Sequence, residues 1–176
     1  MRLEHLSQRR VEFVPVQQTP GGKPVGLWSS QGQWERLQSI HNEADGTLMY
    51  DWKCVLRVDS GKICGFPWVA PEEAAPHNLI RVDMSDEAQL DAFVARFRAD
   101  GKARDVDWAR VQGAFAGAVF ANVESMPGWL WRRYNDPDGC WAISLTVDSA
   151  CVWDPSVIAS RRWSRRRRAT PICKNP

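Results

Sequence analysis

The sequence lacks any long apolar run. The N-terminal stretch MRLEHLSQRRVEFVPV has no apolar core of the kind found in signal peptides, and no window approaches the ~20 apolar residues of a membrane span. We therefore expect a cytoplasmic protein without a membrane partner. The five cysteines are odd in number and show no CxxC or Cys/His spacing, which argues against a disulfide framework and a structural zinc site.

The motifs of several large enzyme classes are also missing. No GxSxG nucleophile elbow, Walker loop or GxGxxG segment occurs, which disfavours nucleophile-based hydrolases and enzymes that cradle phosphates in glycine-rich loops. Only HNEAD at 41–45 approaches the His and carboxylate spacing of a metal site, and a helix end followed by a solvated turn explains it better. We expect no bound metal.

Tryptophan, in contrast, is abundant: the 176 residues include ten tryptophans but only two tyrosines. The length suits one domain, and the mixture of 44% hydrophobic and 25% charged residues is that of a globular protein. The high tryptophan content is therefore the unusual feature of this composition, and it supplies many flat aromatic side chains.

Charge is distributed unevenly. Seven of the 23 lysines and arginines lie in residues 161–176, which contain no acid, so 16 basic residues face 21 acidic ones in the rest. We expect a single domain over 1–160 and a flexible basic tail over 161–176. Two interpretations of the tail stay open, a solvated end and a nucleic-acid contact, in which Trp163 would stack on a base and arginines would bind phosphates. Those arginines are Arg161, Arg162, Arg165, Arg166, Arg167 and Arg168.

Short apolar segments between turn residues predict an α+β fold with mixed or antiparallel sheets and about three helices. Helices are expected over 31–40, 86–99 and 107–115; the second has apolar residues at three-and-four spacing after an acidic cap. The segments expected as strands are RLEHLS, VEFVPV, VGLWSS, LMYDWKCVLRV, NLIRVDM, AGAVFANV, GWLWRRY, WAISLTV and ACVWD.

Aromatic and small polar side chains gather in VGLWSSQGQW. On a strand, Trp28 and Ser30 point to the same side, and Trp34 returns from the first turn of the following helix. Aromatic faces and short hydroxyls, including that of Ser29, suit a planar cationic ring such as nicotinamide. The alternative is that both tryptophans are core residues joining the strand to its helix.

These segments resemble the ADP-ribosyltransferase fold of poly(ADP-ribose) polymerases and bacterial toxins. GLWSSQGQW resembles the motif that binds nicotinamide, with Trp28 at the position of the ring-stacking tyrosine. LEHLS resembles the early strand that supplies a histidine, here His5, and ACVWDPSVI is similar to the closing strand. The chain to about residue 160 is also similar to a group of phage and bacterial proteins with a KPxGLW motif. The resemblance implies NAD as donor and a transferase acting on a protein or nucleic acid in a phage or bacterial conflict setting.

The sequence departs from the family pattern at the catalytic acid. Position 150, where the family places that acid, is alanine, and the candidates to replace it are Asp148 and Glu124. The family's acid steadies the oxocarbenium-like state as nicotinamide leaves, so its loss removes an electrostatic contribution to catalysis. A second hypothesis is therefore a non-catalytic phage accessory or anti-defence module that binds a nucleotide signal or a partner protein in the same cleft. A third is a small nucleic-acid-binding protein that acts through the tail.

Overall fold

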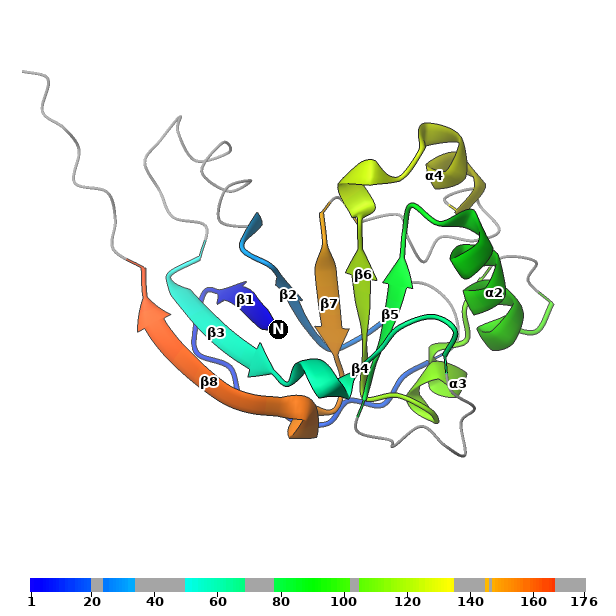
Figure 1. Ribbon diagram of the computed structural model, residues 1–176. Coiled ribbons are helices and arrows are strands. Elements are labelled where there is room, and N and C mark those ends of the chain that lie inside the picture. Colours follow the sequence, from blue (N-terminus) through cyan, green and yellow to red (C-terminus); the bar gives the residue numbers. More distant parts are fainter. Residues whose placement is uncertain are drawn as a thin grey trace, which may run out of the picture.

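One eight-stranded sheet organises the molecule (Figure 1). The computed structural model describes residues 1–19, 24–33, 50–68, 78–101, 105–134, 145 and 147–166. The strands lie in the order β4-β5-β6-β7-β2-β1-β3-β8. Their bounds are β1 Arg2–Ser7, β2 Leu27–Ser30, β3 Trp52–Val58, β4 Ile63–Cys64, β5 Leu79–Asp83, β6 Gly117–Ala121, β7 Ser149–Val152 and β8 Ile158–Arg165.

The sheet is mixed. Strands β4, β5 and β6 pair in parallel, whereas every other neighbouring pair is antiparallel. The helices of the described residues are α2 Glu87–Phe97, α3 Trp108–Gln112 and α4 Gly128–Tyr134, with short 3-10 turns at Ser60–Lys62 (η1), Val123–Ser125 (η2) and Pro155–Val157 (η4). The predicted α+β class with a mixed sheet is confirmed. None of these helices has the length and apolar character needed to cross a membrane.

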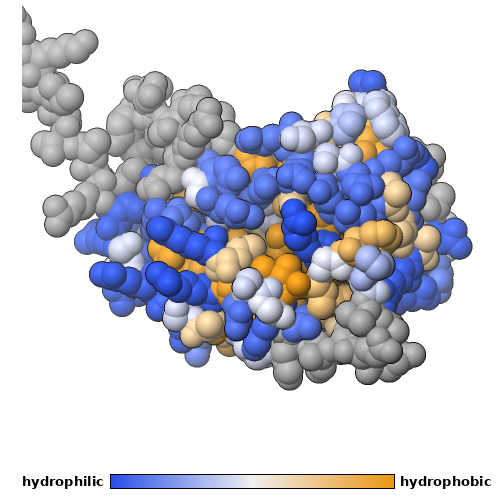
Figure 2. All heavy atoms as spheres, in the orientation of Figure 1, coloured by the Kyte–Doolittle hydropathy of each residue, from blue (hydrophilic) through white to orange (hydrophobic). Residues whose placement is uncertain are grey.

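Two hydrophobic cores lie on opposite faces of the sheet. The helix-side core joins Val82 and Phe120 of the sheet to Phe93 of α2 and Trp108 of α3. The second, which we call the concave core, consists of Leu3, Cys54, Leu56, Val58, Leu79, Ala116, Val119, Ala150, Val152 and Val157. It joins residues of β1 and β3 to residues of β6 and β7, strands that are not neighbours in the sheet, because the sheet curls over on itself (Figure 1). Figure 2 shows hydrophobic surface gathered near the middle of the viewed face, with hydrophilic surface around it.

Helix α2 follows the predicted pattern closely. Asp86 caps it by accepting a hydrogen bond from the backbone N–H of Gln89, and the four residues Leu90, Phe93, Val94 and Phe97 are buried. Helix α3 begins after the cap Asp107 and buries Trp108 and Val111 as predicted. The expected helix over 31–40 lies outside the described residues from position 34 onward.

Two predicted strands are wrong. The segment GWLWRRY is helix α4, which buries Leu130 while Trp129 and Trp131 are exposed. The helical form lets Arg133 form ion pairs with Glu87 and Asp91 of α2, an arrangement that alternating hydrophobicity does not encode. The segment 11–16 contains no strand; Pro15 has no N–H to donate to a ladder.

The predicted boundary between the domain and its tail, at residue 160, falls inside a strand. Strand β8 continues to Arg165 and pairs with β3, with Arg162 opposite Val55 and Arg161 opposite Leu56. Trp163, which one of the two interpretations of the tail assigned to base stacking, packs its ring against His5 and Phe13. Because arginines occupy most positions from 161 to 168, the sequence there does not show the alternation of polar and apolar residues that would predict a strand. Arg167 and Arg168 lie outside the described residues.

Candidate functional site

His5 is held in one orientation on β1. Its Nδ1 lies 2.6 Å from the backbone oxygen of Trp28. Because a carbonyl oxygen only accepts, Nδ1 carries the proton that is donated. The rings of Phe13 and Trp163 approach His5 edge-on, each 6.2 Å away between centroids. The remaining nitrogen, Nε2, is buried and has no hydrogen-bond partner among the described residues. His5 therefore presents a fixed, neutral ring with an unused lone pair.

Burial lowers the pKa of His5 below its ordinary 6.5, while the hydrogen bond to Trp28 acts in the opposite direction. The unfolded chain then binds more protons than the folded chain as the pH falls below about 6.5. We expect the free energy of unfolding to decrease with falling pH from that value until the folded-state pKa is passed.

His5→Asn is expected to remove this pH dependence, because the asparagine amide replaces the Nδ1 donor but does not titrate. The measurement is urea unfolding of both proteins between pH 7.5 and 5, and the informative quantity is the difference between them at each pH. A difference that stays constant across the range would show that His5 does not titrate as a buried group.

Trp28 lies on the opposite face of the sheet from the His5 ring. Its indole stacks on Phe120 in the helix-side core, with 5.9 Å between ring centroids and 14° between planes. The indole Nε1 donates a hydrogen bond of 3.0 Å to the backbone oxygen of Pro24. Ser30 shares this face, as predicted, and is fully buried. Trp34, the second tryptophan expected to contact the planar ring, lies outside the described residues.

Ser29 belongs to the face that carries His5. Glu4 lies opposite Ser30 in the β1–β2 pair, so strand alternation places His5 and Ser29 on the same side. Ser29 is fully buried, and its hydroxyl donates to the backbone oxygen of Ala150 at 3.4 Å. The predicted ligand-binding set is thus divided: His5 and Ser29 face the concave core, whereas Trp28 and Ser30 face the helices.

The two candidate acids lie at the end of the sheet where β6 stops and β7 starts. Asp148 precedes β7, and its Oδ1 accepts a 2.9 Å hydrogen bond from the backbone N–H of Val123. Glu124 follows in η2 and is exposed. Ala150 itself is fully buried in β7, between Ser29 and Val119 of the neighbouring strands. The carboxylate of Asp148 thus has a structural partner, and no acid stands at position 150.

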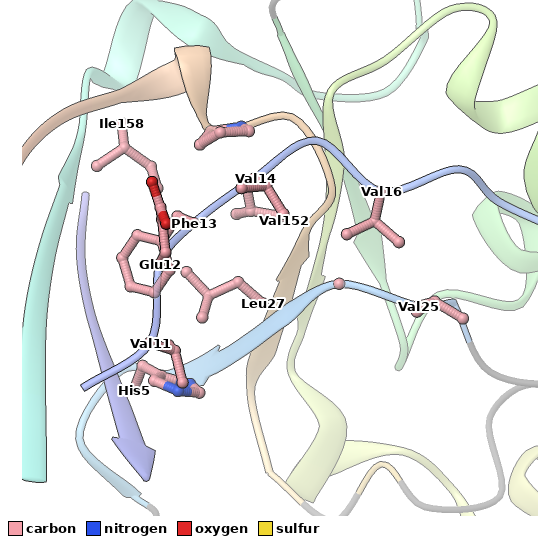
Figure 3. Close-up of a pocket in the computed structure, with 12 residues that line it drawn as sticks. His5, Val11, Glu12, Phe13, Val14, Val16, Val25, Leu27, Val152 and Ile158 are labelled. Carbon is pink, nitrogen blue, oxygen red and sulfur yellow. The ribbon is translucent and has the colours of Figure 1, made fainter. Parts of the chain in front are cut away.

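A pocket of about 280 Å³ opens on the concave side, beside His5. Residues 11–16 run across β2 and β7 and form one wall of it (Figure 3). Figure 3 shows Phe13, Val14 and Val16 of this segment together with Leu27 and Val152 of the strands. His5 lies at one end of the pocket and Ile158 at the other. The lining is mainly apolar, and its titratable side chains are His5 and Glu12.

Sequence reasoning missed Glu12 and Phe13 because they lie in a segment without regular structure. That segment is held by hydrogen bonds rather than by strand pairing: Val16 donates its N–H to Trp153, and the Gln112 side chain donates to the Val16 oxygen. Gln18 extends the same network by exchanging two hydrogen bonds with the backbone of Val25. Hydrogen bonds at Val16 and Gln18 therefore fix one end of this pocket wall.

Cysteine chemistry is disfavoured next to this pocket. Cys54 lies opposite His5 in the β1–β3 pair and is fully buried. Burial raises the pKa of its thiol to about 11, so the thiolate that would act as a nucleophile is scarce at neutral pH. Among the described residues that line the pocket, His5 and Glu12 are the ones whose side chains could take part in acid–base chemistry.

Comparisons with known proteins leave the family open. No family model, curated protein or solved structure matches this chain.

Proposed function

We propose that this chain is an ADP-ribosyltransferase-like protein that binds NAD, with the nicotinamide end in the pocket beside His5. The observation that carries the proposal is the position of the three segments that resemble the family. LEHLS, GLWSS and ACVWD supply β1, β2 and β7, which lie side by side in the order β7-β2-β1 although they are far apart in the sequence. Motifs that form one site must meet in space, and these three do.

The chemistry of the pocket supports a flat, partly apolar ligand. Its lining of valine, leucine and isoleucine is apolar, and Phe13 offers an aromatic surface to a cationic ring. A carboxamide N–H that reached the buried Nε2 of His5 would meet a lone pair without a partner among the described residues. At about 280 Å³ the pocket is near the lower limit for small-molecule sites, which suits one ring and its amide rather than a whole dinucleotide. Phe13 thus takes the stacking role that the sequence assigned to Trp28.

The second candidate function is nucleotide binding without turnover, and it is favoured by Ala150. Cleavage of the nicotinamide bond is assisted by a carboxylate near the developing positive charge on the ribose. Position 150 has none, and the Asp148 carboxylate is engaged by Val123. Glu12 is the carboxylate that lines the pocket, and any transfer reaction in this pocket would depend on it.

A substitution that fills the pocket tests the binding proposal. Val25 lines the pocket and is 51% exposed, so Val25→Trp adds bulk at the mouth with little cost to folding. We expect it to weaken NAD binding by at least tenfold in calorimetric titration, because the indole occupies the ligand's space. Ala95→Trp is the matched control, since Ala95 is exposed on α2 and outside the pocket lining.

Chromatography of the same mixtures for free nicotinamide separates binding from turnover. Nicotinamide release that disappears in Glu12→Gln while binding persists would identify an enzyme, whereas binding without release supports the non-catalytic form. Absence of NAD binding to the wild-type protein would overturn the proposal. Equal binding by wild type and Val25→Trp would place the ligand elsewhere on the molecule.

A further inference from the structure

A second groove, of about 530 Å³, lies along strands β1, β3 and β8. It is lined by Arg2 of β1, by Val55 and Arg57 of β3, and by Ser160, Arg161 and Arg162 of β8. Strand alternation places Arg2, Val55 and Arg57 on the face turned away from Leu3 and Leu56 of the concave core. Ser160 and Arg162 lie opposite Arg57 and Val55 and share this outer face, whereas Arg161 lies opposite Leu56 and its guanidinium lies over the ring of Phe13 on the concave side.

The charge of this groove is of one sign. Among the described residues no carboxylate lines it, whereas Arg2, Arg57 and Arg162 line it from the outer face of the sheet. Glu4, on the same face of β1 as Arg2, is already shared between Arg2 and Lys53 at 2.9 and 3.0 Å. Within the described part of the chain, Arg57 and Arg162 form no ion pair, and both side chains are exposed. The groove thus offers guanidinium groups whose charge the fold does not neutralise.

The strand register places like charges next to each other. Arg2 lies directly opposite Arg57, and Arg162 is two residues along β8 from Ser160, the partner of Arg57. Like charges directly opposite on neighbouring strands are destabilising. An arrangement that works against the stability of the sheet is expected where a ligand supplies the missing charge.

We propose that this groove binds the phosphate backbone of a single-stranded nucleic acid. Opposite residues on neighbouring strands are about 5 Å apart, and alternate residues along a strand about 7 Å apart, so the guanidinium groups form a line of cations along the sheet. Arginine forks bind phosphate oxygens in pairs. A concave groove admits a linear chain of phosphates, whereas the flat headgroup surface of a bilayer does not enter it.

The test is fluorescence anisotropy of the full chain with a labelled single-stranded DNA 20-mer over a range of salt concentrations. Arg57→Gln combined with Arg162→Gln is expected to weaken binding on the order of tenfold at 0.1 M salt. It should also lower the slope of log K against log salt by about 1.4, because each lost phosphate contact on a single strand contributes about 0.7. The control is Arg98→Gln combined with Arg132→Gln, two exposed arginines outside the groove with the same change of net charge.

Three outcomes would overturn the proposal. They are an absence of salt-dependent binding by the wild-type protein, an equal loss of affinity in the two double variants, and binding of anionic phosphatidylserine vesicles at the groove in preference to DNA. Circular dichroism of both double variants checks that a loss of binding is not caused by a loss of folding. The assay contains no NAD, so its result is independent of the pocket beside His5.

Discussion

Gly26→Ala is expected to lower the free energy of unfolding by about 3 kcal/mol, because residue 26 has no room for a side chain. A Cβ at this position would lie 2.7 Å from the backbone oxygen of Val152 and 3.1 Å from the Sγ of Cys151. The φ angle of +154° is also one that L side chains rarely adopt. The closest contact, with the Val152 oxygen, and the unfavourable φ both involve backbone, which cannot move aside as a flexible side chain would.

Urea unfolding followed by circular dichroism measures the effect of this substitution, and Gly65→Ala is its matched control. A Cβ added at Gly65 would meet no atom within 4 Å, so that variant should unfold within about 0.5 kcal/mol of the wild type. If the two alanine variants were equally stable, the chain at Gly26 could not lie as close to Val152 of β7 as the structure places it.

The same glycine links stability to the proposed site. Gly26 precedes Leu27 and Trp28 in the segment that resembles the nicotinamide-binding motif, and it lines the pocket beside His5. Its lack of a side chain lets the chain enter β2 tightly against Val152, a residue of the same pocket. Weakened NAD binding in Gly26→Ala would therefore follow from a displaced pocket wall, which is why the exposed Val25 is the better position for testing the ligand.

Local patterns predicted the elements whose side chains make their contacts nearby. The apolar spacing of α2 and its acidic cap are both local, and so is the inward position of Trp108 and Val111. The alternation that puts Trp28 and Ser30 on one side of β2 is local too. In these cases two or three neighbouring positions decide the conformation, so the sequence is sufficient.

The site itself depended on contacts that no local pattern contains. Whether His5 and Trp28 share a face is set by the register between β1 and β2, since a shift of one residue moves every side chain to the other face. The observed register divides them. Phe13 and Glu12 reach the pocket because the distant Gln112 binds the backbone of Val16, and Gln18 of the same segment binds the backbone of Val25. Neither feature can be derived from spacing along the chain.

Strand β8 shows how charge can conceal structure. Its arginines predicted a solvated tail, but edge strands tolerate charged side chains and benefit from them, because these discourage pairing with other molecules. The alternate residue Trp163 packs against Phe13 and His5 on the concave side. One face of β8 therefore lies beside the proposed ligand pocket, and the other face carries residues of the proposed phosphate groove.

Trp153→Ala is expected to be the most damaging single change, lowering the free energy of unfolding by about 4–5 kcal/mol. The side chain is 1% exposed, and its ring lies 6.2 Å from that of Trp108. Its Nε1 donates a 2.7 Å hydrogen bond to the backbone oxygen of Phe115, which the substitution leaves buried without that donor. Since domains of this size are stable by only about 5–15 kcal/mol, little stability would remain.

Two further variants separate the causes of that loss. Trp153→Phe removes the indole donor and part of the volume, so its cost should fall between those of wild type and alanine. Trp129→Ala, at a tryptophan that is 50% exposed, should change stability by no more than about 0.5 kcal/mol. Equal losses in Trp153→Ala and Trp129→Ala would mean that residue 153 is not part of the core. Because the backbone oxygen of Trp153 accepts the Val16 N–H, a loosened core at Trp153 would also release the segment over the pocket, and NAD affinity should fall together with stability.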